Sequence, residues 1–376
     1  MKAPELPALT GIRFLAASFV FLSHVSLWPG IIWMAPNLNL GNFGVAIFFV
    51  LSGFILTYNY ARLFGNGMSF GNYARFIWDR LAKIYPLYLL TLLLSIPIEL
   101  IGHHRDWSWG SLAMQLTLLQ CILPLDQLRS TDHFNVPGWS ISCEMFFYLL
   151  APLLIWQGLS GKRPIYAVIL GWLAAIVLAV TGGLWAVQAS AWPARFAPAR
   201  VPEFLVGVAT AVCYLKGGTP SKTHINLGVA GGFILLALSL WGNSRAPQFL
   251  SLGFLSAPGA ALLIYGLAYG QGRIAQFLSH RWMVLFGMSS YAFYLIHDLL
   301  IRICKGAFGH FHISVSTPLS MVVVSLALFI LTQFVSICLF KTFEVPAQKY
   351  LRGLVRKKNP DDGVSPKPEF VASNRQ

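Results

Sequence analysis

Long apolar runs separated by short polar segments dominate the pattern along this chain. Several runs reach the roughly 17 to 25 residues that an α-helix needs to cross a bilayer. Ten spans can be drawn, at 12–28, 43–61, 84–101, 139–156, 165–187, 202–216, 226–242, 250–270, 283–303 and 319–341. The pattern predicts an all-α polytopic membrane protein with about ten transmembrane helices.

Two of these spans are weaker than the rest. Span 202–216 is short, and span 250–270 contains Pro258 and four glycines. The apolar segment 111–124 is too short to cross, so we expect a re-entrant or interfacial piece there.

Composition strengthens the membrane prediction. Hydrophobic residues make up 56% of the chain and charged residues only 11%, with a mean hydropathy of +0.64. Soluble globular domains carry about a quarter charged residues. Because most Lys and Arg fall in alternate connecting segments, the positive-inside rule places both termini in the cytoplasm. The net charge of +14 then matches an anionic lipid surface and requires no nucleic acid partner.

We expect two parts along the chain. Residues 1–350 form the transmembrane domain, and residues 351–376 form a basic, disordered cytoplasmic tail whose Arg352–Lys358 cluster meets membrane lipid. The five cysteines form no C-x-x-C pair, and the loop histidines lack the cysteine or carboxylate neighbours of a zinc site. The sequence therefore predicts no metal site.

Arg13 and His24 are two polar side chains inside one apolar span. Their eleven-residue separation corresponds to about three helical turns, which places them on one face about 16 Å apart. Ionisable groups at membrane depth are costly and commonly face a cavity or partner. The pair indicates a buried reaction channel, while the alternative is a snorkelling arginine and a histidine that bonds a neighbouring helix.

A basic cluster precedes the third span. Arg75, Arg80 and Lys83 are interleaved with Tyr73, Phe76 and Trp78. Cations and aromatic rings at the inner interface are ordinary topology signals. The same cluster also suits a cytosolic polyphosphate ligand, since Arg binds phosphate in a planar fork and Lys adds a point charge.

Two further polar groups lie inside predicted spans. Glu144 is the carboxylate of the fourth span, and we expect it to pair with a cation or imidazole of another helix, such as Arg13 or His24, or to stay protonated. His297 lies late in the ninth span, at a depth similar to that of His24. The two histidines either line one polar cavity or each satisfy a structural hydrogen bond.

An ordered series of short motifs resembles the membrane acyltransferase-3 family. The motifs are Leu9-Thr10-Gly11-Ile12-Arg13-Phe14-Leu15 with His24, Phe48-Phe49-Val50-Leu51-Ser52-Gly53-Phe54, Arg80-Leu81-Ala82-Lys83-Ile84-Tyr85-Pro86, Trp139-Ser140 with Glu144 and Phe147-Tyr148, Pro202-Glu203-Phe204-Leu205, Tyr294-Leu295-Ile296-His297, and Glu344-x-Pro346. The match covers nearly the whole chain apart from the tail.

The resemblance implies an enzyme that moves an acyl group from a coenzyme A thioester, with acetyl-CoA favoured, to a hydroxyl group. The implied acceptor is a carbohydrate of an exopolysaccharide, O-antigen or lipid-linked glycan. The implied location of the enzyme is the bacterial cytoplasmic (inner) membrane, with polysaccharide biosynthesis proteins as candidate partners. Arg13 and His24 match the family's catalytic pair. Arg80 and Lys83 match its paired cations, although Lys83 departs from an Arg-x-x-Arg pattern.

The resulting mechanistic hypothesis assigns a role to each polar group. Arg75, Arg80 and Lys83 bind the nucleotide phosphates, and His24 takes the proton of the acceptor hydroxyl. Glu144 or His297 orients the imidazole or the acceptor, and Arg13 steadies the thioester or a developing oxyanion. A polytopic transporter or a noncatalytic component of a polysaccharide export system stays open as an alternative.

Overall fold

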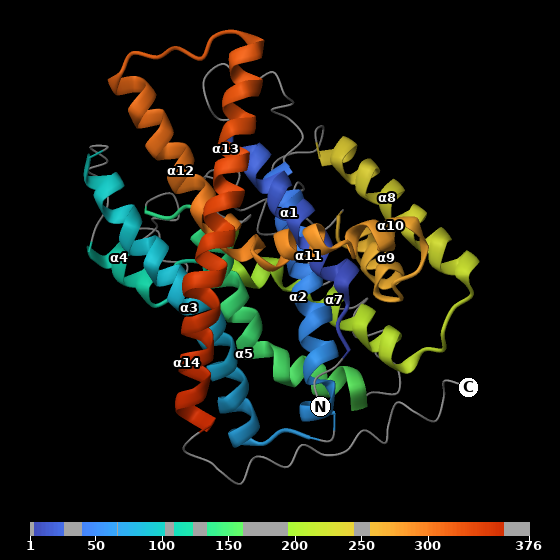
Figure 1. Ribbon diagram of the computed structural model, residues 1–376. Coiled ribbons are helices and arrows are strands. Elements are labelled where there is room, and N and C mark those ends of the chain that lie inside the picture. The colour runs from blue at the N-terminus through green and yellow to red at the C-terminus, as the bar shows by residue number, and fades with distance from the viewer. Residues whose placement is uncertain are drawn as a thin grey trace.

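The computed structural model describes residues 4–25, 40–65, 67–101, 109–122, 134–160, 195–243 and 256–356. Within these ranges the regular elements are helical and no strand occurs, which confirms the all-α class (Figure 1). The elements are α1 (Pro7–Val25), α2 (Leu40–Phe64), α3 (Phe70–Ile101), α4 (Trp109–Leu116), α5 (Gly138–Ser160), α7 (Ala197–Lys216), α8 (Lys222–Asn243), α9 (Ala257–Ala268), α10 (Gly272–Leu278), α11 (Arg281–Met288), α12 (Ser290–His310), α13 (Pro318–Leu339), a π-helical turn (Phe340–Glu344) and α14 (Val345–Arg356).

Six of the described helices are long and apolar enough to cross a bilayer, namely α1, α2, α3, α5, α8 and the continuous helix that begins with α13. The bent pair α11 and α12 brings the number to seven if it counts as one span. The described residues thus form a polytopic membrane bundle, but they do not reach the ten spans predicted from the sequence.

The shortfall has identifiable causes. Predicted span 165–187 lies outside the described residues. Predicted span 202–216 corresponds to α7, which is helical but is not among the helices that are long and apolar enough to cross a bilayer. Predicted span 250–270 yields only the twelve-residue α9 in its described part, too short to cross the hydrocarbon layer. The predicted short segment at 111–124 contains the eight-residue helix α4.

The predicted span at 283–303 falls on two helices, α11 and α12, which are bent by 62° relative to each other. Gly287 lies against the Thr10 carbonyl of α1, where any larger residue would collide. Ser289 then donates its hydroxyl toward the carbonyls of Leu285 and Phe286, each at 3.2 Å. The Leu285 carbonyl also accepts the Ser289 backbone N–H at 3.1 Å, so Ser289 caps the end of α11 with both its amide and its hydroxyl.

The last predicted span, 319–341, is longer than expected. Helix α13, the π-helical turn and α14 form one element of 38 residues, Pro318–Val355, or about 57 Å at 1.5 Å per residue. That length exceeds a hydrocarbon layer of about 30 Å. The helix continues beyond the predicted domain boundary at 350 as far as Arg356, and the rest of the predicted tail lies outside the described residues.

The π-helical turn has a local cause. Pro346 lacks the N–H that would close a regular α-turn onto the carbonyl four residues earlier. The preceding turn widens, and the Val345 amide donates to the Phe340 carbonyl, five residues back. Such insertions rotate the side chains that follow them.

Helix α14 runs along the first part of α3 (Figure 1). The Trp78 indole N–H donates to the Leu351 carbonyl at 3.0 Å, and Arg352 pairs with the Asp79 carboxylate at 3.3 Å. Arg352, predicted to face lipid, therefore binds another helix of the protein. These contacts fix the part of α3 that carries Arg80 and Lys83.

Glycines allow the central helices to approach closely. Gly53 of α2 and Gly207 of α7 face each other's helices, and a Cβ at Gly207 would collide with the Val50 carbonyl. Gly44 meets the Ala16 carbonyl of α1 in the same way. Small residues at such crossings let backbones pack tightly in a membrane, where no hydrophobic effect draws helices together. The crossings place α1 and α2 in the centre of the bundle (Figure 1).

We predict that Gly207→Ala destabilises the bundle by about 1–3 kcal/mol, because the added methyl group overpacks a backbone-to-backbone contact. The measurement is the apparent melting temperature of purified protein in detergent. Gly228→Ala in α8 is the matched control, since a Cβ there meets no atom within 4 Å. An equal or smaller loss at Gly207 would contradict the proposed role of the crossing.

Candidate active site

A single helix, α1, carries both polar residues of the first predicted span. Arg13 lies in its first half and His24 in its last turn. Both side chains are partly buried. Arg13 lines an internal cavity, whereas His24 does not line that cavity and instead faces α12. The two residues thus serve different parts of one polar region.

The cavity lies among α1, α2, α3, α5 and α12. It leaves about 770 Å³ free of protein atoms, including the open space at its mouth. Its lining residues include Arg13, Ser52, Arg80, Lys83, Ser140, Glu144, Tyr148, Ser290, Tyr291 and Tyr294, together with apolar side chains. Four helices other than α1 therefore supply polar groups to it.

Three cations meet at this cavity. Lys83 lies close enough to Arg13 and Arg80 for the charges to repel one another. Arg80 donates to the Tyr60 hydroxyl at 2.8 Å and lies 5.1 Å from the centroid of that ring. The Nε atoms of Arg13 and Arg80 are buried and have no hydrogen-bond partner among the described residues. Buried donors without partners are costly, so the cavity is electrostatically suited to an anionic ligand.

Two carboxylates face the cations. Glu144 accepts a 2.7 Å hydrogen bond from Tyr148 one turn along α5, and it interacts electrostatically with Lys83. Glu344, placed by the π-helical turn, is buried and interacts electrostatically with Lys83 and Arg13. These carboxylates offset part of the buried positive charge.

A pair of histidines lies beyond the cavity. The ring centroids of His24 and His297 are 4.8 Å apart, with the rings nearly perpendicular. Nδ1 of His24 lies 2.9 Å from the Val20 carbonyl, and Nδ1 of His297 lies 2.7 Å from the Tyr294 carbonyl. A carbonyl only accepts, so each Nδ1 donates and each Nε2 keeps its lone pair. The arrangement holds both imidazoles in the tautomer that suits a general base.

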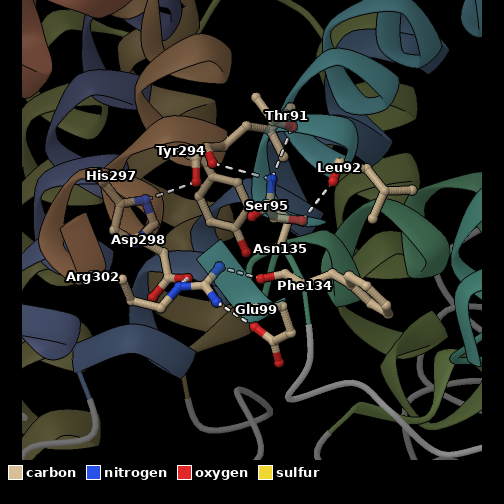
Figure 2. A network of polar contacts seen from close by, with 11 residues as sticks. Thr91, Leu92, Ser95, Glu99, Phe134, Asn135, Tyr294, His297, Asp298 and Arg302 are labelled. Atoms are coloured by element: carbon tan, nitrogen blue, oxygen red, sulfur yellow. Dashed lines mark hydrogen bonds and ion pairs between the residues drawn. The ribbon is translucent and has the colours of Figure 1, made fainter. Parts of the chain in front are cut away.

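An ion-pair network stands next to this pair (Figure 2). Arg302 of α12 donates to Glu99 of α3 at 2.9 Å, donates to the Phe134 carbonyl and pairs with Asp298 at 3.0 Å. Asn135 then donates to Thr91 and to the Leu295 carbonyl. The network joins α3, the 134–135 segment and α12, and so fixes the helix that carries His297.

The structure brings together most of the residues predicted from the sequence, in two groups. Arg13, Arg80, Lys83 and Glu144 share the cavity, and His24 and His297 share a contact. Arg75 lies on α3 but does not line the cavity, because five residues separate it from Arg80, a rotation of about 140° around the helix. Two partners were considered for Glu144, namely Arg13 and His24. Glu144 lines the same cavity as Arg13, whereas His24 does not line it, so Arg13 is the nearer of the two candidates.

Several polar residues of the region were not singled out from the sequence. Glu344 belongs to the motif Glu344-x-Pro346 but received no role from it, and Tyr60 lies in no motif that points to the cavity. Arg302 could have been linked to Asp298, because an i, i+4 spacing of opposite charges on a helix favours an ion pair. Its contact with Glu99 joins residues 203 positions apart and depends on tertiary structure.

Comparison with known proteins identifies the family. A family model described as "Acyltransferase domain" (Acyl_transf_3) matches residues 6–341. The chain belongs to this acyltransferase family. The acyltransferase is 32% identical over 341 residues to the acyltransferase MdmB of Streptomyces mycarofaciens, covering 82% of this chain and 81% of that protein.

More distant relatives are named as O-acetyltransferases. The acyltransferase is 25% identical to the putative peptidoglycan O-acetyltransferase YrhL of Bacillus subtilis and 25% identical to the O-acetyltransferase OatA of Staphylococcus aureus. The match to YrhL covers 78% of this chain and 48% of YrhL, and the match to OatA covers 80% of this chain and 51% of OatA. The chain thus spans about half the length of these two relatives. No solved structure matches the chain.

We predict that Arg302→Ala destabilises the acyltransferase by about 3 kcal/mol, because it leaves the Glu99 carboxylate buried without its cation. Glu99 is 3% exposed and Arg302 22%. The apparent melting temperature in detergent should fall by several degrees. Lys305→Ala, an exposed cation on the same helix, is the control and should change it little. Equal melting temperatures for the two variants would contradict the assigned role of Arg302.

Proposed function

We propose that this acyltransferase moves an acyl group, with acetyl favoured, from acyl-CoA to a hydroxyl of a cell-surface carbohydrate in the bacterial cytoplasmic membrane. The observation that carries the proposal is the adjacency of a cation-lined cavity and a pair of contacting imidazoles within one membrane bundle. An anionic donor and a hydroxyl acceptor need these two environments. The names of the relatives in Bacillus and Staphylococcus, O-acetyltransferases in both cases, support the reaction class.

The donor site is assigned to the cations. Arg80 and Lys83 attract the phosphates of coenzyme A, with Arg80 held by Tyr60. The phosphopantetheine arm is long, thin and mostly uncharged, so it fits a cavity that has apolar walls and a few hydroxyl groups. Arg13 lies deeper along α1 and directs a buried N–H of its guanidinium to the arm or the thioester.

The acceptor site is assigned to the histidines. Nε2 of His24 takes the proton from the acceptor hydroxyl while that oxygen attacks the thioester carbon. The new C–O bond forms, the C–S bond breaks, and the departing thiolate receives the proton from the imidazolium. His297 orients His24 through the ring contact and keeps the base in an apolar setting. Glu144 balances the charge of the donor cavity.

We predict that His24→Ala lowers the rate of acyl transfer at least about 100-fold, which is the usual contribution of a general base. The assay uses inside-out membrane vesicles and radiolabelled acetyl-CoA, and it follows label entering the glycan fraction. Leu22→Ala, an exposed position in the same turn of α1, controls for local damage to the helix. Full transfer by His24→Ala protein present at normal levels would exclude the base assignment and favour a transport or scaffold role.

We also predict that Arg80→Ala raises the KM for acetyl-CoA about tenfold or more with a smaller change in kcat, because a charge-assisted phosphate contact is lost. Arg62→Ala at the end of α2 is the control, since Arg62 is exposed and does not line the cavity. An unchanged KM for Arg80→Ala would show that the donor phosphates bind elsewhere.

The carbohydrate acceptor is tested in cells. Mass spectrometry of surface glycans, with and without the acyltransferase, should show one class of acetyl ester that disappears together with the protein. Restoration by the wild type, and failure of His24→Ala to restore it, would connect the ester to this site. An unchanged glycan profile would exclude a surface carbohydrate as the acceptor.

A further inference from the structure

Three tyrosines line the cavity, and they differ in whether their hydroxyl proton is already used in a hydrogen bond within the protein. The Tyr148 hydroxyl donates to Glu144 at 2.7 Å, and the Tyr291 hydroxyl donates to the Ile84 carbonyl at 2.7 Å. A phenol has one proton, so both of these donors are committed. The Tyr294 hydroxyl instead accepts from the Ser140 hydroxyl at 2.8 Å. Its own proton has no acceptor among the described residues.

Tyr294 also stands between the two halves of the candidate site. Its side chain lines the cavity that contains Arg13 and Lys83. Its ring centroid lies 5.9 Å from that of His297, and its backbone carbonyl accepts from His297 Nδ1 at 2.7 Å. Figure 2 shows this carbonyl facing the imidazole. Tyr294 therefore contacts both the cavity and His297.

The surroundings fix the Tyr294 ring. It packs edge-on against Phe48 of α2, with centroids 5.8 Å apart, and it is 5% exposed. The second contact of the Ser140 hydroxyl, with the Pro137 carbonyl, is longer at 3.2 Å. Because the shorter contact is with Tyr294, Ser140 supports a phenol that donates outward into the cavity.

The same face of α12 carries another hydroxyl suited to a polar ligand. Ser290 lies four residues before Tyr294 and therefore on the same side of the helix. It lines the cavity, is fully buried, and its Oγ has no hydrogen-bond partner among the described residues. Buried hydroxyls are normally bonded, so this face of α12 is adapted to a ligand that supplies oxygen acceptors.

From these observations we infer that the Tyr294 hydroxyl is a catalytic residue, the hydrogen-bond donor that stabilises the oxyanion formed from the thioester carbonyl during acyl transfer. The inference rests on the proposed function. As the acceptor oxygen bonds to the carbonyl carbon, the C=O π electrons move to oxygen, which Tyr294 holds while Ser140 bonds to the phenol oxygen. The electrons return as the C–S bond breaks. The phenol keeps its proton throughout, and the imidazole carries the proton that is transferred.

Such a donor acts on the transition state more than on the bound substrate. Losing one oxyanion donor typically lowers kcat by about 100- to 1,000-fold. A hydroxyl that served only to bind the donor would change KM instead. The division between kcat and KM therefore separates this role from a structural or binding role.

The test compares Tyr294→Phe with Tyr88→Phe in the vesicle assay with radiolabelled acetyl-CoA. We expect kcat to fall about 100-fold or more for Tyr294→Phe, with the KM for acetyl-CoA within about threefold of the wild type. Tyr88→Phe removes a buried hydroxyl that donates to the Gln115 carbonyl at 2.9 Å and does not line the cavity, so it should lower kcat at most about fivefold. A fall of less than tenfold for Tyr294→Phe, or a change in KM alone, would overturn the inference.

A second variant covers the case in which Tyr294→Phe fails to accumulate. Ser140→Ala leaves the phenol in place and removes its supporting donor, so kcat should fall about tenfold with little change in KM. A wild-type kcat for Ser140→Ala would then count against the inference. If the wild-type protein transfers no label from acetyl-CoA, the proposed function is wrong, and the assignment of Tyr294 fails with it. If the wild type is active and the variants keep its kcat, only the assignment of Tyr294 is wrong.

Discussion

The burial of charge inside an apolar bundle is the constraint on which the rest of this structure depends. Hydrocarbon cannot solvate a guanidinium or an ammonium group, so each one must find a cavity, a counter-ion or a hydrogen bond within the protein. Arg13, Arg80 and Lys83 meet this requirement together, in one cavity that also contains Glu144 and lies near Glu344. Their mutual repulsion is tolerated only because carboxylates and hydroxyls line the same space. A cavity of this kind attracts an anion.

Irregular helix geometry delivers the other side chains. Glycine contacts let α2 approach α1 and α7 closely, and the bend before Ser290 aims α12 across the bundle. The π-helical turn brings Glu344 toward the cations, and α14 holds the start of α3 through Trp78 and Arg352. Each of these features departs from a regular, straight helix at a specific residue. Straight, evenly spaced spans would leave these polar groups on different faces.

Helix α12 connects the two halves of the site. It presents Ser290 and Tyr294 to the cavity and His297 to His24, while Arg302 binds it to α3 and to the 134–135 segment. A single rigid element therefore sets the distance between the site proposed for the donor and the base proposed for the acceptor. Acyl transfer needs such rigidity, because the reacting atoms must approach within bonding geometry.

Sequence alone predicted the all-α class and the membrane setting, because both are recorded in local composition and the length of apolar runs. Its motifs indicated the family and singled out Arg13, His24, Arg80 and Lys83 as candidate site residues. Only the tertiary structure decided that Arg75 does not line the cavity and that His24 meets His297. It also decided that, among the described residues, the Tyr291 hydroxyl has an acceptor and the Tyr294 hydroxyl accepts from Ser140. The break at Ser289 and the position of Glu344 near Lys83 and Arg13 were also not predicted. The physical reason is that hydropathy records whether a residue is buried, whereas partners come from contacts between helices far apart in the chain.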